Sequence, residues 1–218
     1  GKYFTFEELQ EKIKPLQTDK DDKLIVLYAS DKDAQHSYIE AAEEKGYEVL
    51  LLDSPLTAHF IQKLESAYEK TEFARVDADH IDNLIKKDEN TVSKLSEEEK
   101  EKLKPLVTEV VPENYVVQLE AMDSQAPAFV VTQPEFMRRM QDMNKVGGGM
   151  FGNSHLPDMY HLVVNTNHEL IGKILETKTK AKKEKLIKQC VDLARLSKNL
   201  LKGEELTTFI KRSFELIK

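Results

Sequence analysis

Cysteine and tryptophan are the scarcest residues of this chain, which has one cysteine, Cys190, and no tryptophan among 218 residues. A lone cysteine cannot form a disulfide within the chain, and this is typical of proteins in a reducing compartment. No apolar run approaches the roughly 18 residues that span a membrane. The opening residues, GKYFTFEELQ, lack the three-part pattern of a signal peptide. These absences predict a soluble, cytoplasmic protein with no membrane partner.

An excess of positive charge is missing as well. The chain carries 32 Lys and Arg against 39 Asp and Glu, which gives a net charge of −7. A protein whose main partner is nucleic acid usually needs surplus basic side chains to neutralise phosphates, so we expect no nucleic acid partner. Hydrophobic residues make up 40% and charged residues 33% of the chain, which indicates a globular protein of one or two domains.

The motifs of common catalytic sites are also absent. The glycine cluster GGGMFG, at 147–152, follows a predicted helix, whereas a phosphate-binding loop joins a strand to a helix. The six histidines and the cysteine show no zinc-ligand spacing, and no serine lies in a GxSxG elbow. We therefore predict no catalytic residue, no metal site and no cofactor in this chain.

The sequence predicts a small three-layer α/β unit in residues 1–86. Three apolar stretches, at 24–28, 47–53 and 71–77, have the length and composition of buried strands, and helical patterns lie between them. A strand, a helix and a further strand joined by short loops form a right-handed parallel crossover. This part of the chain is therefore predicted to contain a parallel sheet covered by helices.

Capping residues predict the helix ends in this unit. Thr5 and Glu8 have the spacing of a capping box, and Gly46 suits the left-handed residue that ends a helix. Ser54 and Pro55 are predicted to begin the next helix as its cap and first-turn residue. The apolar residues of that helix that we expect to face inward are Leu56, Phe60, Ile61 and Leu64.

Residues 87–104 differ in composition from what precedes them. The stretch KKDENTVSKLSEEEKEKLK, at 86–104, is dominated by charge. Ser96 and Glu99 form a second capping box, which predicts a helix running to about Val111. We interpret the segment as a charged connection between two domains, and the alternative is an exposed helix on one continuous domain.

Residues 105–218 are predicted to form an α+β domain. Strand patterns at 114–121 and 128–132 are joined by a turn with Pro127, and a third strand is predicted at 160–166. Two helices, at about 180–201 and 204–217, end the chain. Their wide apolar stripe is predicted to pair with a second copy, so that two helix pairs form a four-helix bundle in a homodimer. The predicted dimerisation residues are Leu186, Cys190, Leu193, Leu200, Leu206, Phe209, Ile210, Phe214 and Ile217.

Four of the six methionines lie in one stretch, QPEFMRRMQDMNKVGGGMF, at 133–151. Thr132 and Glu135 have capping-box spacing, with Pro134 in the first turn, which predicts that a helix begins here. The methionines at 137, 140 and 143 fall on one helical face with Phe136, and Arg138, Arg139 and Asp142 lie on the other. Exposed methionine suits apolar partners of variable shape, and the alternative is that these methionines belong to the core.

Several segments together resemble the C-terminal part of the bacterial HtpG chaperones, members of the 90-kDa heat-shock protein family. They are YFTFEELQEKI, LIVLYASDKDA with EAAEEKGYEVLLLDSPLTAHFIQKL, APAFVVT followed by EFMRRM, LVVNTNHELIGKIL and FIKRSFELI. The chain departs from the family pattern at Thr166, where NPDH with a proline is usual, and at EAMDSQAP, where an arginine is often found.

The resemblance implies part of a stress-response chaperone that assists protein folding. The parent protein would bind and hydrolyse ATP with Mg²⁺ in a nucleotide domain, whereas this chain, which begins with Gly1, would be a piece without that domain and not an enzyme. Its last helices would form a homodimer. The residues that would contact unfolded client proteins are Phe136, Met137, Met140, Met143, Met150 and Phe151.

Two other functions remain open from the residues alone. The chain could be a purely structural dimerisation scaffold whose methionines are buried. Alternatively, residues 1–86 could be a small-ligand-binding α/β module with a pocket at the strand ends, near Ser30 and Asp31.

Overall fold

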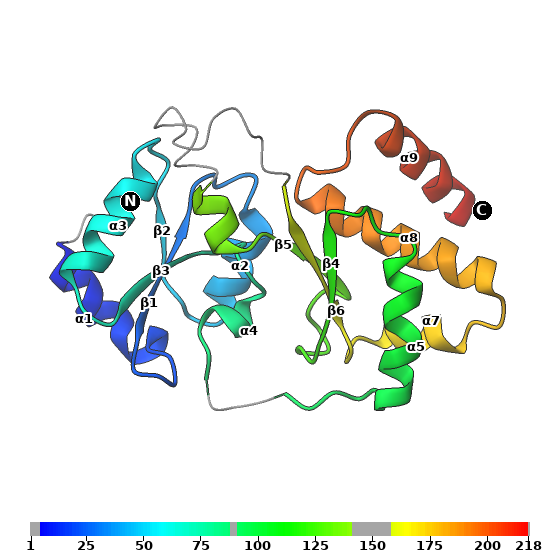
Figure 1. The fold of residues 1–218 in the computed structure, drawn as a ribbon, viewed down its shortest axis with the longest axis horizontal. Helices are drawn as coiled ribbons and strands as arrows, with labels where there is room; N and C mark the ends of the chain where they lie inside the picture. The colour runs from blue at the N-terminus through cyan, green and yellow to red at the C-terminus, as the bar shows by residue number, and fades with distance from the viewer. Residues whose placement is uncertain (1–4, 88–90, 141–157, 218) are drawn as a thin grey trace. The chain divides into compact units, whose positions relative to one another are not determined.

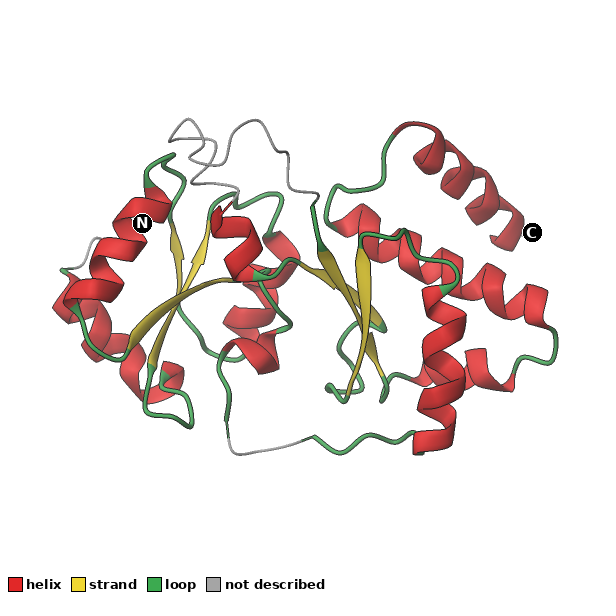
Figure 2. Ribbon diagram, in the orientation of Figure 1, coloured by secondary structure: helices red, strands yellow, loops and turns green. Residues whose placement is uncertain are grey.

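The computed structural model describes residues 5–87, 91–140 and 158–217, which form two compact units (Figures 1 and 2). The first, which we call the α/β unit, comprises Gly1–Glu89 and Gln133–Asp158, and the second, the α+β unit, comprises Asn90–Thr132 and Met159–Lys218. Neither unit is a single continuous stretch of the chain. Residues 90–104 group with the α+β unit, and the methionine-bearing segment that follows β5 groups with the α/β unit.

The α/β unit is built on a parallel three-stranded sheet of order β2-β1-β3. Helices α1 and α3 cover one face of this sheet and α2 and α4 lie on the other (Figure 1), which confirms the predicted three-layer arrangement. The elements are α1 (Phe6–Gln17), β1 (Leu24–Ala29), α2 (His36–Glu44), β2 (Val49–Leu51), α3 (Thr57–Ala67), β3 (Thr71–Arg75), α4 (Ile81–Leu84) and a helical segment at 135–140.

Local chemistry explains two of these helix ends. The Thr5 hydroxyl accepts from the Glu8 amide at 3.2 Å and the Glu8 carboxylate accepts from the Thr5 amide at 2.8 Å, which confirms the capping box. Gly46 follows α2 with φ +75°, a conformation that side chains disfavour. A Cβ at this glycine would also lie 3.3 Å from Cδ1 of Leu16.

The start and inward face of α3 differ from the prediction. Ser54 does not cap the helix, because its carbonyl and hydroxyl instead hold a preceding turn by accepting from the amides of Thr57 and Leu56. The helix begins at Thr57. Ile61 is fully buried, but Leu56 is 60% exposed and Phe60 52% exposed. Their assignment to the inward face was wrong, because Leu56 precedes the helix and the core side of α3 is centred on Ile61, about 100° around the helix axis from Phe60.

The α+β unit contains a second three-stranded sheet, of order β4-β6-β5. β4 runs parallel to β6 and β5 runs antiparallel to it. The two strands predicted to be joined by a turn with Pro127 therefore do not pair with each other, because β6 lies between them. The elements are α5 (Glu97–Thr108), β4 (Tyr115–Glu120), β5 (Phe129–Thr132), β6 (Tyr160–Asn165), α7 (Glu169–Glu176), α8 (Lys180–Ser197) and α9 (Gly203–Ile217).

Helix α7 was not predicted from the sequence. The Nδ1 atom of His168 accepts from the Leu170 amide at 3.1 Å and caps the helix, an unusual role for histidine. Ile171 and Ile174 on α7 are fully buried in a core that is shared with α5, α8 and the sheet. At eight residues, α7 is too short to be stable alone, so its formation depends on this burial.

The end of the predicted interdomain connection is attached to the α+β unit. Ser96 and Glu99 form the expected capping box of α5, which ends at Thr108 rather than near Val111. Upstream of it, the Asn167 side chain accepts from the Lys94 amide at 2.7 Å and donates to the Val92 carbonyl at 3.0 Å. These bonds attach residues 92–94 to the α+β unit. None of the helices in the described ranges is long and apolar enough to cross a membrane.

Candidate functional surfaces

The helix at 135–140 exposes Phe136 to solvent and turns its basic side to the α/β unit. Phe136 is 73% exposed, whereas Arg138 is only 5% exposed. The Arg138 guanidinium hydrogen-bonds to the Tyr28 hydroxyl, lies 5.6 Å from the centre of that ring and pairs with Glu135 at 2.5 Å. This orientation places polar contacts inside and leaves an aromatic residue outside.

Arg139 forms a second set of contacts with the same unit. Its guanidinium donates to both oxygens of Glu65, at 2.8 and 3.0 Å, and to the carbonyl oxygen of Phe73 at 2.5 Å. It also pairs with Glu135 at 2.7 Å. Two parallel hydrogen bonds between a guanidinium and a carboxylate fix the relative orientation of the two side chains as well as pairing their charges.

Burial and the neighbouring charges have opposite effects on the pKa of Glu135. Burial by itself would raise the pKa of Glu135, but Arg138 and Arg139 outweigh it and hold that pKa below its usual range. Burial, with the nearby Glu135 charge, raises the pKa of Tyr28, so its hydroxyl stays a proton donor. The Glu135 carboxylate accepts from the Tyr28 hydroxyl at 3.0 Å.

The capping box predicted from Thr132 and Glu135 does not form. Thr132 belongs to β5, and its hydroxyl is buried without a hydrogen-bond partner among the described residues. The Glu135 carboxylate turns instead to the two arginines. Helical residues begin at Glu135, and the Arg138 amide donates to the Pro134 carbonyl at 3.1 Å.

The predicted client-contact residues fall into three groups. Phe136 is exposed, and Met137 and Met140 are half-buried. Met143, Met150 and Phe151 lie outside the described residues, so the structure does not place them.

The surface between α8 and α9 is charged. Asp192 is buried and pairs with Arg212 at 2.6 Å, and Arg195 holds both oxygens of Glu205 at 2.9 and 2.8 Å. Gln189 accepts from Arg212 at 2.7 Å. The hydrogen bond from Arg195 holds the pKa of Glu205 below its usual range. Helix α9 is therefore attached to α8 largely through polar side chains.

The opposite side of α9 is apolar and exposed. We call Ile210, Phe214 and Ile217 the α9 outer face; Phe214 is 64% and Ile217 81% exposed. Leu193 on α8 is also exposed, and the sequence prediction missed two further exposed residues, Leu196 and Leu216.

The other predicted dimerisation residues lie deeper in their own chain. Phe209 is buried, and Leu206 is half-buried. Leu186, Cys190 and Leu200 pack against the core of the α+β unit. Burial raises the pKa of the Cys190 thiol to about 11, so this thiol is largely unreactive at neutral pH.

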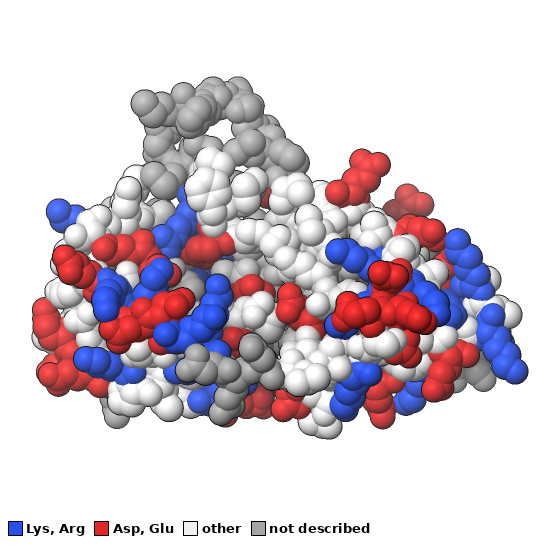
Figure 3. Space-filling model, turned by 60° about the horizontal axis from the view of Figure 1, so that its bottom comes forward, with Lys and Arg blue, Asp and Glu red and all other residues white. Residues whose placement is uncertain are grey.

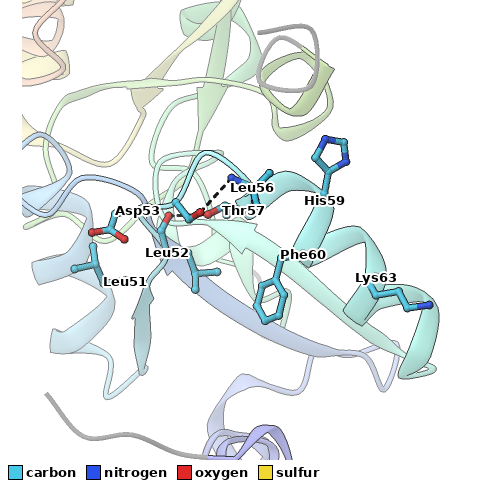
Figure 4. Close-up of a pocket in the computed structure, with 9 residues that line it drawn as sticks. Leu51, Leu52, Asp53, Leu56, Thr57, His59, Phe60 and Lys63 are labelled. Carbon is cyan, nitrogen blue, oxygen red and sulfur yellow. Dashed lines mark hydrogen bonds between the residues drawn. The ribbon is translucent and has the colours of Figure 1, made fainter. Parts of the chain in front are cut away.

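A third apolar surface lies on the α/β unit, between the end of β2 and the start of α3. Leu51, Leu56 and Phe60 line an open groove of about 690 Å³, together with Asp53 and Lys63. Phe60 and His59 point in opposite directions from α3 (Figure 4). Sequence reasoning missed this groove, because the same residues also fit the spacing of a buried helix face.

The strand ends near Ser30 and Asp31 do not form an open ligand cradle. The side-chain oxygen of Gln35 accepts from the amides of Ser30 and Asp31 at 2.7 and 3.0 Å. The Gln35 amide in turn donates to Asp77 at 2.8 Å, and Asp77 is paired with Arg75. The backbone donors that would hold an anionic ligand are therefore already used by the chain itself.

Acidic and basic side chains are mixed on one face of the molecule. Lys and Arg are interspersed with Asp and Glu on the face shown in Figure 3. Within the described ranges, no group of three His, Cys, Asp or Glu side chains is arranged to hold a metal ion. The features of the described surface that call for explanation are therefore its apolar faces.

The fold and these surfaces define a class of protein in which an α/β unit and an α+β unit both present apolar side chains to solvent. Residues 5–215 match the family model described as Hsp90 protein. The chain therefore belongs to the Hsp90 family.

The similar proteins are bacterial chaperones. Chaperone protein HtpG of Bacteroides thetaiotaomicron is 36% identical in a match that covers all of this chain and 42% of that protein. HtpG of Bacteroides fragilis strain YCH46 is 34% identical with the same coverage. HtpG of Porphyromonas gingivalis strain ATCC 33277 is 43% identical over 80% of this chain and 26% of its own length. The chain thus spans less than half of the curated relatives that it matches.

Proposed function

We propose that this chain is the part of a cytoplasmic chaperone that forms a homodimer and contacts unfolded client proteins. The contact is made by the apolar side of the 135–140 helix, with Phe136, Met137 and Met140 as its described members. Family membership supports the chaperone role, and the apolar surfaces support the two kinds of contact.

The orientation of the 135–140 helix carries this proposal. A helix normally turns its apolar side to the core, but here Arg138 is buried and Phe136 is exposed. Burying one such aromatic side chain is worth about 1.5–3 kcal/mol, which this chain forgoes unless a partner covers it. Methionines beside it adapt to partners of different shape, as a chaperone requires.

Dimerisation is proposed to use the α9 outer face. The side of α9 that faces α8 makes charged contacts, while Ile210, Phe214 and Ile217 are 45–81% exposed. A second copy related by two-fold symmetry would present the same face and complete a four-helix bundle.

The Leu56–Phe60 groove is a further candidate for apolar contact with clients. Three of its apolar residues, Leu51, Leu56 and Phe60, are more than half exposed, and exposed apolar patches of this kind mark interaction sites. We assign no reaction and no cofactor to this chain. ATP turnover with Mg²⁺ is proposed for the parent protein, in a nucleotide domain outside these residues.

The test is the affinity of this chain for a permanently unfolded protein. The triple variant Phe136→Ser, Met137→Ser and Met140→Ser is expected to bind at least tenfold more weakly, about 1.4 kcal/mol. The matched control is Lys173→Ser, which removes an exposed side chain from α7. Light scattering and thermal melting should show that each variant remains folded with the parent's oligomeric state.

Two outcomes would contradict the proposal. If the folded triple variant binds as well as the parent, the client contact lies elsewhere. If the triple variant unfolds, the two methionines act as core residues, and the chain is better described as a structural dimerisation scaffold.

A further inference from the structure

The described residues of the 135–140 helix are held to the α/β unit by polar side chains. Phe136 is 73% exposed, and Met137 and Met140 are half-buried, so apolar burial at this helix is incomplete. The polar contacts lie at two places on the α/β unit.

The first place is the buried hydroxyl of Tyr28. Tyr28 lies in the central strand β1 and is 1% exposed. Its hydroxyl donates to Glu135 at 3.0 Å, and Arg138 reaches the same oxygen. A buried hydroxyl without a partner is costly, so the sheet and the helix each satisfy polar groups of the other.

The second place is the outer edge of β3. The Phe73 amide donates to a Glu65 oxygen at 2.8 Å, and the Phe73 carbonyl accepts from Arg139 at 2.5 Å. Because Glu65 and Arg139 also bind each other through two hydrogen bonds, they form a closed ring around one residue of an edge strand. Side chains thus occupy a donor and an acceptor that another strand could otherwise use.

We infer that Arg138, Arg139 and Glu135 form a docking face that fixes the 135–140 helix to the α/β unit and keeps its apolar side available. Tyr28 and Glu65 are the matching positioning residues. The inference rests on the proposed function, because it says how the client-contact helix is held. A helix docked through its apolar side would have no apolar side left for a partner.

This inference assigns the two proposed contacts to different units. The client-contact helix belongs with the α/β unit, although strand β5, directly before it in sequence, belongs to the α+β unit that carries α9. A motion of the α/β unit would therefore carry the client-contact helix with it. The sequence alone placed both contacts in one domain.

Hydrogen exchange of the whole 218-residue chain, without client, tests the docking. Glu65→Gln and Arg139→Gln are expected to lower the protection of the amides at 138–140 at least tenfold and to leave those of β1 unchanged. Arg139→Lys keeps the charge but loses the two-bond geometry, so we expect an intermediate loss. The matched control is Glu72→Gln, which removes an exposed carboxylate from β3, next to Phe73, where it pairs with Lys23.

The outcomes separate the docking from the client contact. Unchanged exchange in Glu65→Gln and Arg139→Gln would overturn the docking whatever the client affinity. If exchange rises in Glu65→Gln and its client affinity falls, although no client-contact residue has changed, the positioning role is supported. If exchange rises but the Phe136 triple variant still binds client normally, the docking stands and the client assignment falls. Loss of β1 protection in Glu65→Gln would instead show a general core role and overturn the inference.

Discussion

At the scale of single residues, the main finding is which side chains of the 135–140 helix are buried. Arg138 lies inside because Tyr28 and Glu135 offer it matched partners, and Phe136 lies outside. Hydrophobicity alone would order these residues the other way. The order follows from the buried Tyr28 hydroxyl, because leaving it without a partner would cost about 1–3 kcal/mol, comparable to the gain from covering one more apolar side chain.

The titration of Glu135 should control how firmly this helix is held. Its pKa is lowered in the folded chain, so its contribution to stability is present above its ordinary pKa of about 4.3 and is lost as the pH falls through the folded value. We expect the protection factors at 138–140 to fall as the pH drops below about 4, within the window set by these pKa values.

A pair of variants checks this assignment. In Glu135→Gln, protection should be lower at neutral pH, and the acid-dependent loss should be missing. Glu169→Gln, which removes an exposed carboxylate paired with Lys173, should retain the acid-dependent loss. An acid-dependent loss that persists in Glu135→Gln would show that another group is responsible.

At the scale of elements, helix α9 shows how a helix can be attached through charge and still leave an apolar side exposed. Asp192 and Arg195 on α8 hold Arg212 and Glu205 on α9. The periodicity of α9 was visible in the sequence, but its orientation was not. An apolar stripe alone cannot indicate whether its own chain or a second copy covers it.

The α9 outer face should set the oligomeric state. Phe214→Ser with Ile217→Ser is expected to weaken dimerisation at least tenfold, about 1.4 kcal/mol, because each dimer would lose both copies of this apolar contact. Sedimentation equilibrium measures the effect, and Lys211→Ser, an exposed polar position on the same helix, is the control. If the double variant associates as strongly as the parent, α9 does not form the interface.

At the scale of the whole molecule, the chain carries a proposed client contact on one unit and a proposed dimer contact on the other. Two copies of the client contact in a dimer make the second contact with one long client intramolecular. Affinity for a long client should therefore depend on dimerisation even though α9 itself does not touch the client.

Comparing two ligands tests this dependence. The Phe214→Ser, Ile217→Ser variant should bind a long unfolded protein at least tenfold more weakly than the parent does. It should bind a short peptide with one apolar segment equally well, because a short peptide occupies one site. Fluorescence anisotropy gives both affinities. An equal loss for both ligands would indicate that α9 contacts the client directly.

The sequence by itself determined part of the local structure and the family. Capping boxes at Thr5 and Ser96, the helix end at Gly46 and the apolar strand β1 depend on neighbouring residues and were predictable. The tertiary structure alone decided that β6 separates β4 from β5, that Phe60 faces outward and that Arg138 faces inward. Those features depend on partners distant in sequence, such as Tyr28, which lies 110 residues before Arg138. Short-range sequence patterns give the spacing of residues along the chain, whereas burial depends on which residues, distant in sequence, come into contact in the fold.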